Sequence, residues 1–383
     1  MLADERRARC PWIRETTLCL RFAAVRFNGS TVSTGSLGVV EREGSSGANA
    51  AIGRSHSPHR AAIDPLEESA ERPLWSVMIP AYNCADHLGA AIESVLAQDP
   101  GPERMQIEVV DDCSDDGTAD VAARFGERVS LFRQPRNLGN VGNFNACLAR
   151  ARGHLIHLLH GDDAVRPGFY ERLQAPLSGS AAIGAAFCRY IAIDGDGNWT
   201  GVSPLESAAA GVLDGWVETL ALGQRLQPPC IAVRREAYER LGGFDDRISY
   251  SEDWEMWTRI AGAYEVWHDP APLALYRVHE GTISDRTLRS GANVADLRRA
   301  IEMNREALPG ERAAEITREA LQITALTALR RGRRRLGAGD TEAAAAQLRE
   351  ALATNRSARV LGGALLLQLL RVRRWILVGL GRR

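Results

Sequence analysis

The chain contains the stretch His154-Leu-Ile-His-Leu-Leu-His-Gly-Asp-Asp163, a short apolar run that ends in two adjacent carboxylates. A run of this length closed by a polar turn is typical of a buried strand. Two earlier stretches share the pattern: Trp75 to Ile79 is followed by Pro80-Ala-Tyr-Asn83, and Gln106 to Val110 by Asp111-Asp-Cys-Ser-Asp-Asp-Gly-Thr118. The sequence therefore predicts three buried strands, each with a polar turn at its carboxyl end.

Segments with a helical spacing of apolar residues alternate with these strands. We expect helices over 86–97, 118–125, 141–151 and 169–173, and a further strand over 129–132. This alternation predicts an α/β fold with a Rossmann-like, mostly parallel sheet flanked by helices. Ligands bind such sheets beyond the carboxyl ends of the strands, so the three polar turns form the expected site.

The second half of the sequence is less regular. We expect strands over 185–193, 230–233, 264–267 and 273–278, and helices over 235–241 and 252–261. From about residue 289 onward the pattern is helical and rich in Ala, Leu and Arg. The first 72 residues are rich in Gly, Ser and Arg without a sustained period, which is typical of poor order. We therefore expect three parts: a poorly ordered segment 1–72, an α/β domain 73–290 and a helical basic extension 291–383.

Charge is balanced over the whole chain but not along it. The 47 basic and 48 acidic residues give a net charge of −1, which argues against a nucleic-acid-binding protein. All basic residues are Arg, and residues 311–383 hold 15 Arg against six acids. Basic and apolar residues are neighbours at Arg371 to Val378. This pattern favours contact with an anionic membrane surface, with a solvated helix end as the alternative.

The seven cysteines are scattered and form no C-x-x-C pair, so neither a disulfide framework nor a zinc site is indicated. A reducing cytoplasm fits this usage best. Uninterrupted apolar runs of the ~18 residues that span a membrane are missing from the sequence. We expect a cytoplasmic protein, in contact with the inner face of the plasma membrane if the basic tail binds lipid.

The stretch His160-Gly-Asp162-Asp163 has the residue types of a cation site. Two carboxylates at one strand end repel each other unless a cation or hydrogen bonds offset the repulsion. Mg²⁺ takes one or two protein carboxylates and completes its shell with water and substrate phosphates, which suits a nucleoside diphosphate complex. A solvated turn before Pro167 is the alternative. Residues 111–118 leave a similar choice between hydrogen bonds to a nucleoside and a simple turn with a helix cap.

The order of these motifs resembles that of the family 2 glycosyltransferases, which have the GT-A fold. The matching motifs are P-A-Y-N at 80–83, V-V-D-D-x-S-x-D-G-T at 109–118, R-N-x-G at 136–139, Asn145, G-D-D at 161–163, P-G at 167–168, L-G-G-F-D at 241–245, S-E-D-W-E at 251–255, Y-R-V-H at 276–279 and Ser284. The resemblance covers about 210 of the 383 residues. No G-x-G-x-x-G or G-x-x-x-x-G-K-[ST] follows a strand, so the phosphate loops of dinucleotide-binding and P-loop proteins are absent from the sequence.

The resemblance implies which residues bind a nucleotide-sugar donor, a UDP-sugar being the first expectation. These are Pro80, Ala81, Tyr82, Asn83, Asp111, Asp112, Asn137, Gly139, Asn145, His160, Gly161, Asp163 and Arg277. Asp162 and His279 would hold Mg²⁺ or Mn²⁺. One position departs from the family pattern, because His160 replaces the first Asp of the Asp-x-Asp motif. An imidazole there can hydrogen-bond a ribose or ligate an ion.

The resemblance also implies the catalytic residues. Glu252 and Asp253 match the acidic pair on the acceptor side, and Asp253 would be the general base that takes the proton of the attacking hydroxyl. A capping segment for the helix that follows is the alternative for this pair. Single displacement on the opposite face of the sugar would invert the anomeric centre.

We therefore expect an inverting, metal-dependent, hexosyltransferase-like enzyme that transfers sugar to a glycan or lipid-linked acceptor in cell-surface polysaccharide or glycolipid synthesis. A non-catalytic protein that kept the fold to bind sugar nucleotides or glycans is the alternative, and the replacement at His160 favours it. A nucleotidyltransferase would need a Gly-rich basic loop after the first strand, and Pro80-Ala-Tyr-Asn83 is not such a loop.

Overall fold

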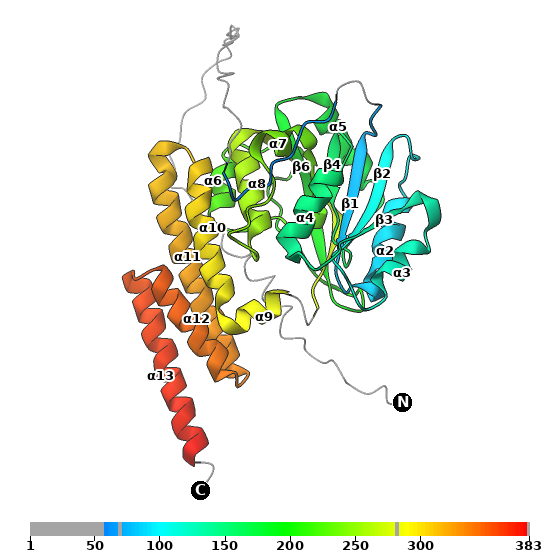
Figure 1. The fold of residues 1–383 in the computed structure, drawn as a ribbon. Coiled ribbons are helices and arrows are strands. Elements are labelled where there is room, and N and C mark those ends of the chain that lie inside the picture. Colours follow the sequence, from blue (N-terminus) through cyan, green and yellow to red (C-terminus); the bar gives the residue numbers. More distant parts are fainter. Residues whose placement is uncertain (1–56, 68–70, 280–282, 381–383) are drawn as a thin grey trace, which may run out of the picture.

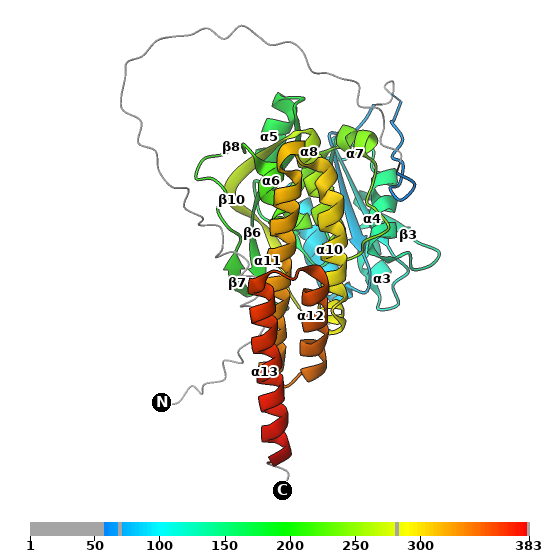
Figure 2. The same cartoon turned by 90° about the vertical axis from the view of Figure 1, so that its left-hand side faces the viewer.

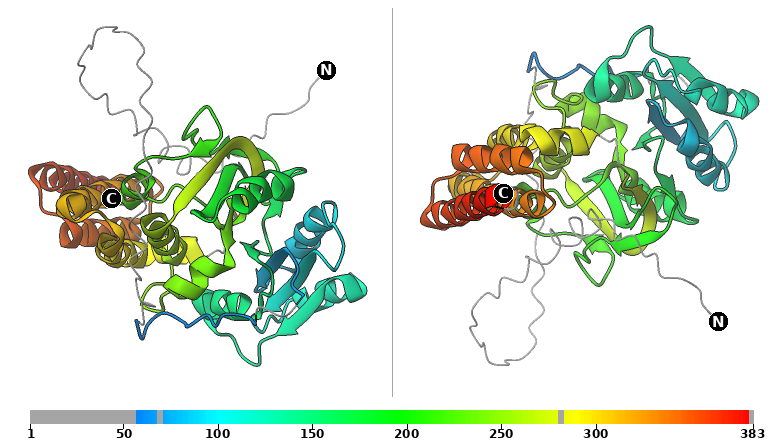
Figure 3. Two further views of the ribbon diagram at one scale, coloured as in Figure 1. Left: turned by 90° about the horizontal axis from the view of Figure 1, so that it is seen from above. Right: turned by 90° about the horizontal axis from the view of Figure 1, so that it is seen from below.

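The computed structural model describes residues 57–67, 71–279 and 283–380 of the chain (Figure 1). Its centre is a ten-stranded sheet in the order β3-β2-β1-β4-β9-β6-β10-β5, with β7 beside β6 and β8 beside β10. Helices flank the sheet, and the last helices lie on one side of the α/β domain, away from β3 (Figure 3). The expected α/β fold with a helical C-terminal extension is confirmed.

The first half of the sheet is parallel, as expected. It contains β1 (Trp75–Ala81), β2 (Met105–Asp111), β3 (Ser130–Arg133) and β4 (Leu155–Leu158), with α2 (Ala85–Leu96), α3 (Thr118–Ala123), α4 (Gly139–Arg150) and α5 (Phe169–Gly179). Every residue of β1 and β2 is buried, because helices cover both faces of a parallel sheet. Parallel pairing also brings the carboxyl ends of β1, β2 and β4 to one edge.

The second half makes the sheet mixed rather than mostly parallel. It contains β5 (Ala164–Val165), β6 (Ile183–Ile193), β7 (Trp199–Val202), β8 (Gly211–Val212), β9 (Ile231–Arg234) and β10 (Glu265–Arg277), with α6 (Trp216–Ala221), α7 (Arg235–Leu241) and α8 (Glu252–Ala263). β9 is antiparallel to β4 and to β6, whereas β10 is parallel to β6. The strands expected at 264–267 and 273–278 are one strand, β10. Its register with β6 shifts between Asp269 and Pro272, because a proline cannot donate to the ladder.

The C-terminal helical unit, residues 283–380, consists of α9 (Ile283–Ser290), α10 (Ala292–Asn304), α11 (Gly310–Gly337), α12 (Thr341–Thr354) and α13 (Ala358–Leu380). α11, α12 and α13 pack side by side (Figure 2) around a small core that includes Leu329 and Leu367. A second small core joins Trp254 of α8 to Ile301 of α10. Within the described residues, no helix is both long and apolar enough to cross a membrane.

Residues 57–67 depart from the expectation of a poorly ordered N-terminal segment. The amide of Gly243 donates to the carbonyl of Ala61 at 2.8 Å. The Arg60 guanidinium, 6% exposed, lies 3.4 Å from Asp245 and 3.3 Å from Glu255, both buried. These partners are about 190 residues away in the sequence, so no local pattern predicts the contact. Residues 1–56 lie outside the described residues.

The loop at Leu241 to Phe244 is held closely against α4 and α8. The Arg259 guanidinium donates to the carbonyls of Leu241 at 2.6 Å, Gly242 at 3.1 Å and Gly243 at 2.9 Å. The Asn145 side chain exchanges two hydrogen bonds with the backbone of Phe244, at 2.8 and 3.0 Å. A Cβ at Gly243 would stand 2.3 Å from Asn145 Oδ1, so this position has no room for a side chain.

We predict that Gly243→Ala destabilises the protein by about 1–3 kcal/mol, because Asn145 must move and lose its paired hydrogen bonds. Urea unfolding at pH 7 measures the change. Gly362→Ala in α13 is the matched control, since nothing lies within 4 Å of its added methyl group. Equal midpoints for the two variants would contradict the close packing at Gly243.

Candidate active site

The three polar turns meet at one edge of the sheet, as the sequence predicts. The amide of Asp112, after β2, donates to the carbonyl of Ala81 at the end of β1, at 2.9 Å. The amide of Gly161, after β4, donates to the carbonyl of Pro80 at 3.1 Å. Gly161 has no room for a side chain, since a Cβ would stand 2.6 Å from the Cys84 sulfur. The turns after β1, β2 and β4 therefore form one continuous surface.

The two carboxylates after β2 are buried and hold neighbouring loops. Asp112 accepts the amide of Leu138 at 2.7 Å and that of Gly139 at 2.9 Å, one on each oxygen. Burial raises the pKa of Asp112, and these two hydrogen bonds oppose the rise. Asp111 accepts hydrogen bonds from Ser114 and lies 3.3 Å from the Arg133 guanidinium. Asn137 joins the same loop through a hydrogen bond of 3.3 Å from its side chain to the carbonyl of Asp112.

The turn after β1 is fixed against the turn after β2. Asn83 has a left-handed backbone, with φ 47°, and its side-chain oxygen accepts the amide of Asp115 at 3.0 Å. The amide of Asn83 donates to the Ser114 hydroxyl at 2.9 Å. The neighbouring Tyr82 is 52% exposed. A rigid turn thus presents an aromatic ring at the edge of the site, where a planar base can stack on it.

The residues after β4 form a possible metal site, which we call the β4 triad: His160, Asp162 and Asp163. One potential ligand atom from each lies within 4.8 Å of the others. Nε2 of His160 and Oδ2 of Asp163 are buried and accept or donate no hydrogen bond among the described residues. The His160 ring stacks on Phe144 of α4, with ring centres 5.0 Å apart. Carboxylate oxygens with an imidazole nitrogen are suitable ligands for a divalent ion such as Mn²⁺.

The end of β10 and His279 just after it contact the β4 triad. His279 Nε2 lies 3.2 Å from Asp162 Oδ2, and Asp163 Oδ1 accepts the amide of Arg277 at 2.8 Å. Burial alone would raise the pKa of Asp162. The hydrogen bond with His279 and the charges of His160 and His279 outweigh this effect, so the pKa of Asp162 is lowered. Burial and the charge of Asp162 raise the pKa of Asp163. The Arg277 guanidinium donates to the carbonyls of Asp162 and Asp194, so in this conformation it ties two loops together.

The acidic pair, Glu252 and Asp253, forms the first turn of α8. Both side chains are buried, at 6% and 7% exposure. Glu252 accepts a hydrogen bond of 2.5 Å from the Asn140 side chain, and Asp253 accepts one of 2.7 Å from Gln224. The second carboxylate oxygen of Glu252 has no partner among the described residues. Burial raises the pKa of Glu252 to about 8 and that of Asp253 to about 7, and the charge of Asp253 adds to the rise at Glu252.

Two sets of contacts connect the acidic pair with the rest of the site. Asn140, which reaches Glu252, follows directly after Gly139, whose amide is bound by Asp112. The buried thiol of Cys230 lies close enough to Asp163 and Asp253 for both charges to act on it. Burial is the main reason that its pKa rises to about 12, and the two carboxylates add to the rise. The acidic pair is thus linked through Asn140 to the loop that Asp112 binds, and Asp163 and Asp253 both lie near Cys230.

Sequence reasoning missed three side chains of this site. Asn140 and Gln224 hydrogen-bond the acidic pair, and the His87 ring lies 5.5 Å from that of His279. None of them stands in a recognisable motif. Asn145, which the resemblance places on the donor side, uses its amide group on the backbone of Phe244. The remaining candidate residues lie in one of four places: the last residues of β1, β2 and β10, the turns that follow β1, β2, β4 and β10, the segment from the end of β3 to the first residue of α4, and the start of α8.

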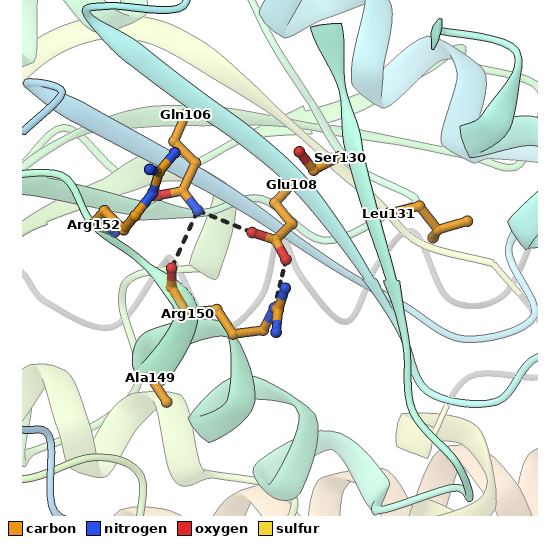
Figure 4. Close-up of a pocket in the computed structure, with 7 residues that line it drawn as sticks. All are labelled: Gln106, Glu108, Ser130, Leu131, Ala149, Arg150 and Arg152. Carbon is orange, nitrogen blue, oxygen red and sulfur yellow. Dashed lines mark hydrogen bonds and ion pairs between the residues drawn. The ribbon is translucent and has the colours of Figure 1, made fainter. Parts of the chain in front are cut away.

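A pocket at the opposite edge of the sheet is separate from this site. Figure 4 shows its lining side chains, which come from the beginnings of β2 and β3 and the end of α4. Glu108 is bound there by Gln106 at 2.9 Å and by Arg150 at 2.5 Å. Gln106, Glu108 and Arg150 thus bind one another, and we assign this pocket a structural role.

Comparison with known proteins identifies the class. Residues 76–242 match the family described as glycosyl transferase family 2. An uncharacterised protein of Mycobacterium tuberculosis is 30% identical over 252 residues, which are 60% of this chain and 75% of that protein. Succinoglycan biosynthesis protein ExoO of Rhizobium meliloti is 32% identical over 230 residues, 57% of this chain and 64% of ExoO.

A similar solved structure is that of Staphylococcus aureus TarS, residues 1–349, in complex with UDP-GlcNAc. Its TM-score is 0.52 at 15% identity, over 72% of this chain and 90% of that one, which shows a shared GT-A fold. The match to this family and the glycosyltransferase-named relatives define a glycosyltransferase. The chain belongs to glycosyltransferase family 2, which confirms the resemblance seen in the motifs.

We predict that Asp253→Asn stabilises the folded protein at pH 8 by about 1–3 kcal/mol. A carboxyl group with a raised pKa keeps its proton in the folded state, so the wild type loses stability as pH rises from about 4, through the folded pKa of about 7. The variant cannot ionise and avoids this loss. Thermal unfolding at pH 5 and pH 8 measures the difference, with the exposed Asp196→Asn as control. A variant no more stable than wild type at pH 8 would contradict the raised pKa.

Proposed function

We propose that this glycosyltransferase inverts the anomeric centre and uses a divalent metal ion to transfer a sugar from a nucleoside diphosphate to an acceptor hydroxyl. One observation supports the proposal: the loop after β2 is joined through Asn140 to a buried acidic pair with raised pKa values, and a triad of potential metal ligands follows the neighbouring strand β4. The acidic pair can take the proton of the attacking hydroxyl, and a metal ion at the triad can stabilise the leaving diphosphate.

The donor half of the proposal rests on the β4 triad and the turns around it. Asp162 would hold the ion with His279 nearby, and His160 offers a buried nitrogen in place of the usual first carboxylate. A bound divalent ion neutralises the charge of a leaving diphosphate. Tyr82 and the loops held by Asp111 and Asp112 would hold the nucleoside. A UDP-sugar is the favoured donor, with support from TarS, a protein of the same fold bound to UDP-GlcNAc.

The acceptor half rests on the acidic pair. With a pKa of about 7, about half of the Asp253 side chains are deprotonated at neutral pH, and a pKa near the working pH is the best range for a general base. Glu252, with a pKa of about 8, keeps its proton longer and can donate a hydrogen bond through its unpartnered oxygen. Because the pKa values of the two carboxyl groups differ, Asp253 can act as the base while Glu252 acts as a hydrogen-bond donor. Attack by the acceptor on the face opposite the diphosphate inverts the sugar.

The acceptor is proposed to be a growing glycan or a lipid-linked sugar, and nucleic acid is not a partner. Support comes from ExoO, whose name assigns it to succinoglycan biosynthesis, and from a Bacillus subtilis relative named as a putative teichuronic acid biosynthesis glycosyltransferase. The second relative is 35% identical over 95 residues, 24% of this chain. Synthesis of a cell-surface polysaccharide would consume the product.

We predict that Asp162→Asn abolishes metal-dependent donor binding, whereas Asp253→Asn binds the donor normally and lowers kcat by at least 100-fold, since general-base catalysis contributes about 10²–10⁴-fold. Calorimetry with UDP-, GDP- and dTDP-sugars, with and without Mn²⁺, measures binding. The anomeric proton coupling of the product measures inversion.

Exposed Asp196→Asn is the control for both variants. A wild type that binds donors but transfers and hydrolyses none would favour the non-catalytic sugar-nucleotide or glycan-binding protein. Full turnover by Asp253→Asn would remove Asp253 from the role of base.

A membrane contact on the cytoplasmic side is proposed for α13. Its outer face carries exposed apolar side chains one and two turns apart, namely Leu361, Leu365, Leu369 and Val372, between 47% and 62% exposed. Arg371 and Arg373 lie on either side of this stripe, and the helix has no acidic residue. An apolar stripe flanked by cations is the pattern of a helix that lies in an anionic membrane surface, where each Arg contributes about 1 kcal/mol.

We predict that the full chain sediments with vesicles containing 30% phosphatidylserine and that Leu365→Ser/Leu369→Ser reduces the bound fraction at least fivefold, because burial of each leucine is worth about 1.5–3 kcal/mol. Leu205→Ser, an equally exposed leucine outside α13, is the control. Binding should weaken at high salt, since the attraction of Arg is screened. Unchanged partitioning of the double variant would refute the contact.

A further inference from the structure

One carboxylate of the C-terminal helical unit reaches into the α/β domain. Asp296 of α10 is 6% exposed and accepts hydrogen bonds from the amides of Ser249 at 3.0 Å, Tyr250 at 3.3 Å and Ser251 at 3.1 Å. The Ser251 hydroxyl donates a further bond at 2.5 Å. Four donors from three consecutive residues thus converge on one side chain, and Ser251 immediately precedes the acidic pair.

The contact with Asp296 takes the place of a side-chain cap at the start of α8. Ser251 is the N-cap residue of α8, but its side chain makes no capping bond to the helix, because the hydroxyl is bound to Asp296. The Asn140 side chain also binds this stretch, since it donates to the carbonyl of Ser249 at 2.9 Å. The position of the loop therefore depends on a charge supplied from about 45 residues away.

The element that carries Asp296 is itself held firmly against the loop. Ile248, 1% exposed, and Trp254, 1% exposed, pack in one core with Ile301 of α10. Arg299 of α10 donates to the carbonyl of Arg247 at 3.1 Å. Apolar packing thus fixes the distance between α10 and the loop, and Asp296 fixes the orientation of the loop backbone.

We propose that Asp296 is a positioning residue that aligns the acidic pair with the acceptor, so that the C-terminal helical unit completes the active site. The inference rests on the proposed function of Glu252 and Asp253. Hydrogen bonds from amides to a buried carboxylate are about twice as strong as neutral ones, and a shift of about 1 Å at a catalytic group costs on the order of 100-fold in rate. The negative charge also lies near the N-terminus of α8, where the helix dipole favours it.

The charge of Asp296 gives the proposal a second readout. Burial is the main cause of the raised pKa values of the acidic pair, and Asp296 adds to both. Removal of its charge should therefore lower the pKa of Asp253. If Asp296 served only to stabilise the fold, its replacement would leave the pKa of Asp253 unchanged. Alternatively, the pKa of Asp253 would change only together with a loss of stability of the whole protein.

The test uses full-length Asp296→Asn, which keeps the side-chain shape and removes the charge. We expect faster hydrogen exchange at the amides of residues 249–251, a kcat lower by 10- to 100-fold, an unchanged donor KM, and an acid limb of kcat/KM that moves to lower pH. Ser251→Ala, which removes one of the four donors, should show a smaller change in exchange and in kcat.

Asp340→Asn is the matched control, because Asp340 caps α12 in the same helical unit through the amide of Ala343, at 2.9 Å. Because Asn caps a helix about as well as Asp, this variant should leave stability, the loop exchange and the acid limb nearly unchanged. Unchanged exchange at 249–251, or an unchanged kcat in Asp296→Asn, would overturn the inference. A wild-type enzyme that transfers no sugar from any donor would instead overturn the proposed function, and exchange at 249–251 would still report whether Asp296 holds the loop.

Discussion

The structure depends on how it accommodates negative charge that is buried at one edge of its sheet. Asp112, Asp163 and Asp296 have no lysine to pair with, because the chain contains none. Each instead accepts backbone amides, from Leu138 and Gly139, from Arg277, and from residues 249–251. A charge-assisted hydrogen bond to a backbone amide fixes the chain as well as the charge. The carboxylates therefore determine where the loops of the site lie.

A few buried polar atoms of the site have no protein partner among the described residues and are available to bind a ligand. Oδ2 of Asp163, Oε2 of Glu252 and Nε2 of His160 are buried without a hydrogen bond among the described residues. Burial of such atoms is unfavourable unless something else binds them. They lie in the two groups that the proposed reaction needs, the β4 triad and the acidic pair. The replacement of a carboxylate by His160 keeps a ligand atom in this region while it removes one negative charge.

The alternation of apolar strands with polar turns and helices was sufficient to predict the first half of the α/β domain. β1, β2 and β4 with their polar turns lie where the apolar runs indicated, because a buried parallel strand must be apolar throughout. The antiparallel direction of β9, the continuity of β10 and the contacts of the segment at Arg60 were missed. Each depends on partners far away in the sequence, and periodicity carries no information on such pairs. Asp296 was missed for the same reason, as one acid among many in a helical tail.

The packing of α10 against the loop before α8 also has an evolutionary consequence. In the sequence, the α/β domain ends and the helical unit begins near residue 290. The site includes residues from both parts, because Asp296 and Ile301 of the helical unit contact the loop before α8 and Trp254. Recombination at that point would join an α8 loop to a foreign α10 and break the contact at Asp296. The loop before α8 and helix α10 are therefore constrained to be inherited together.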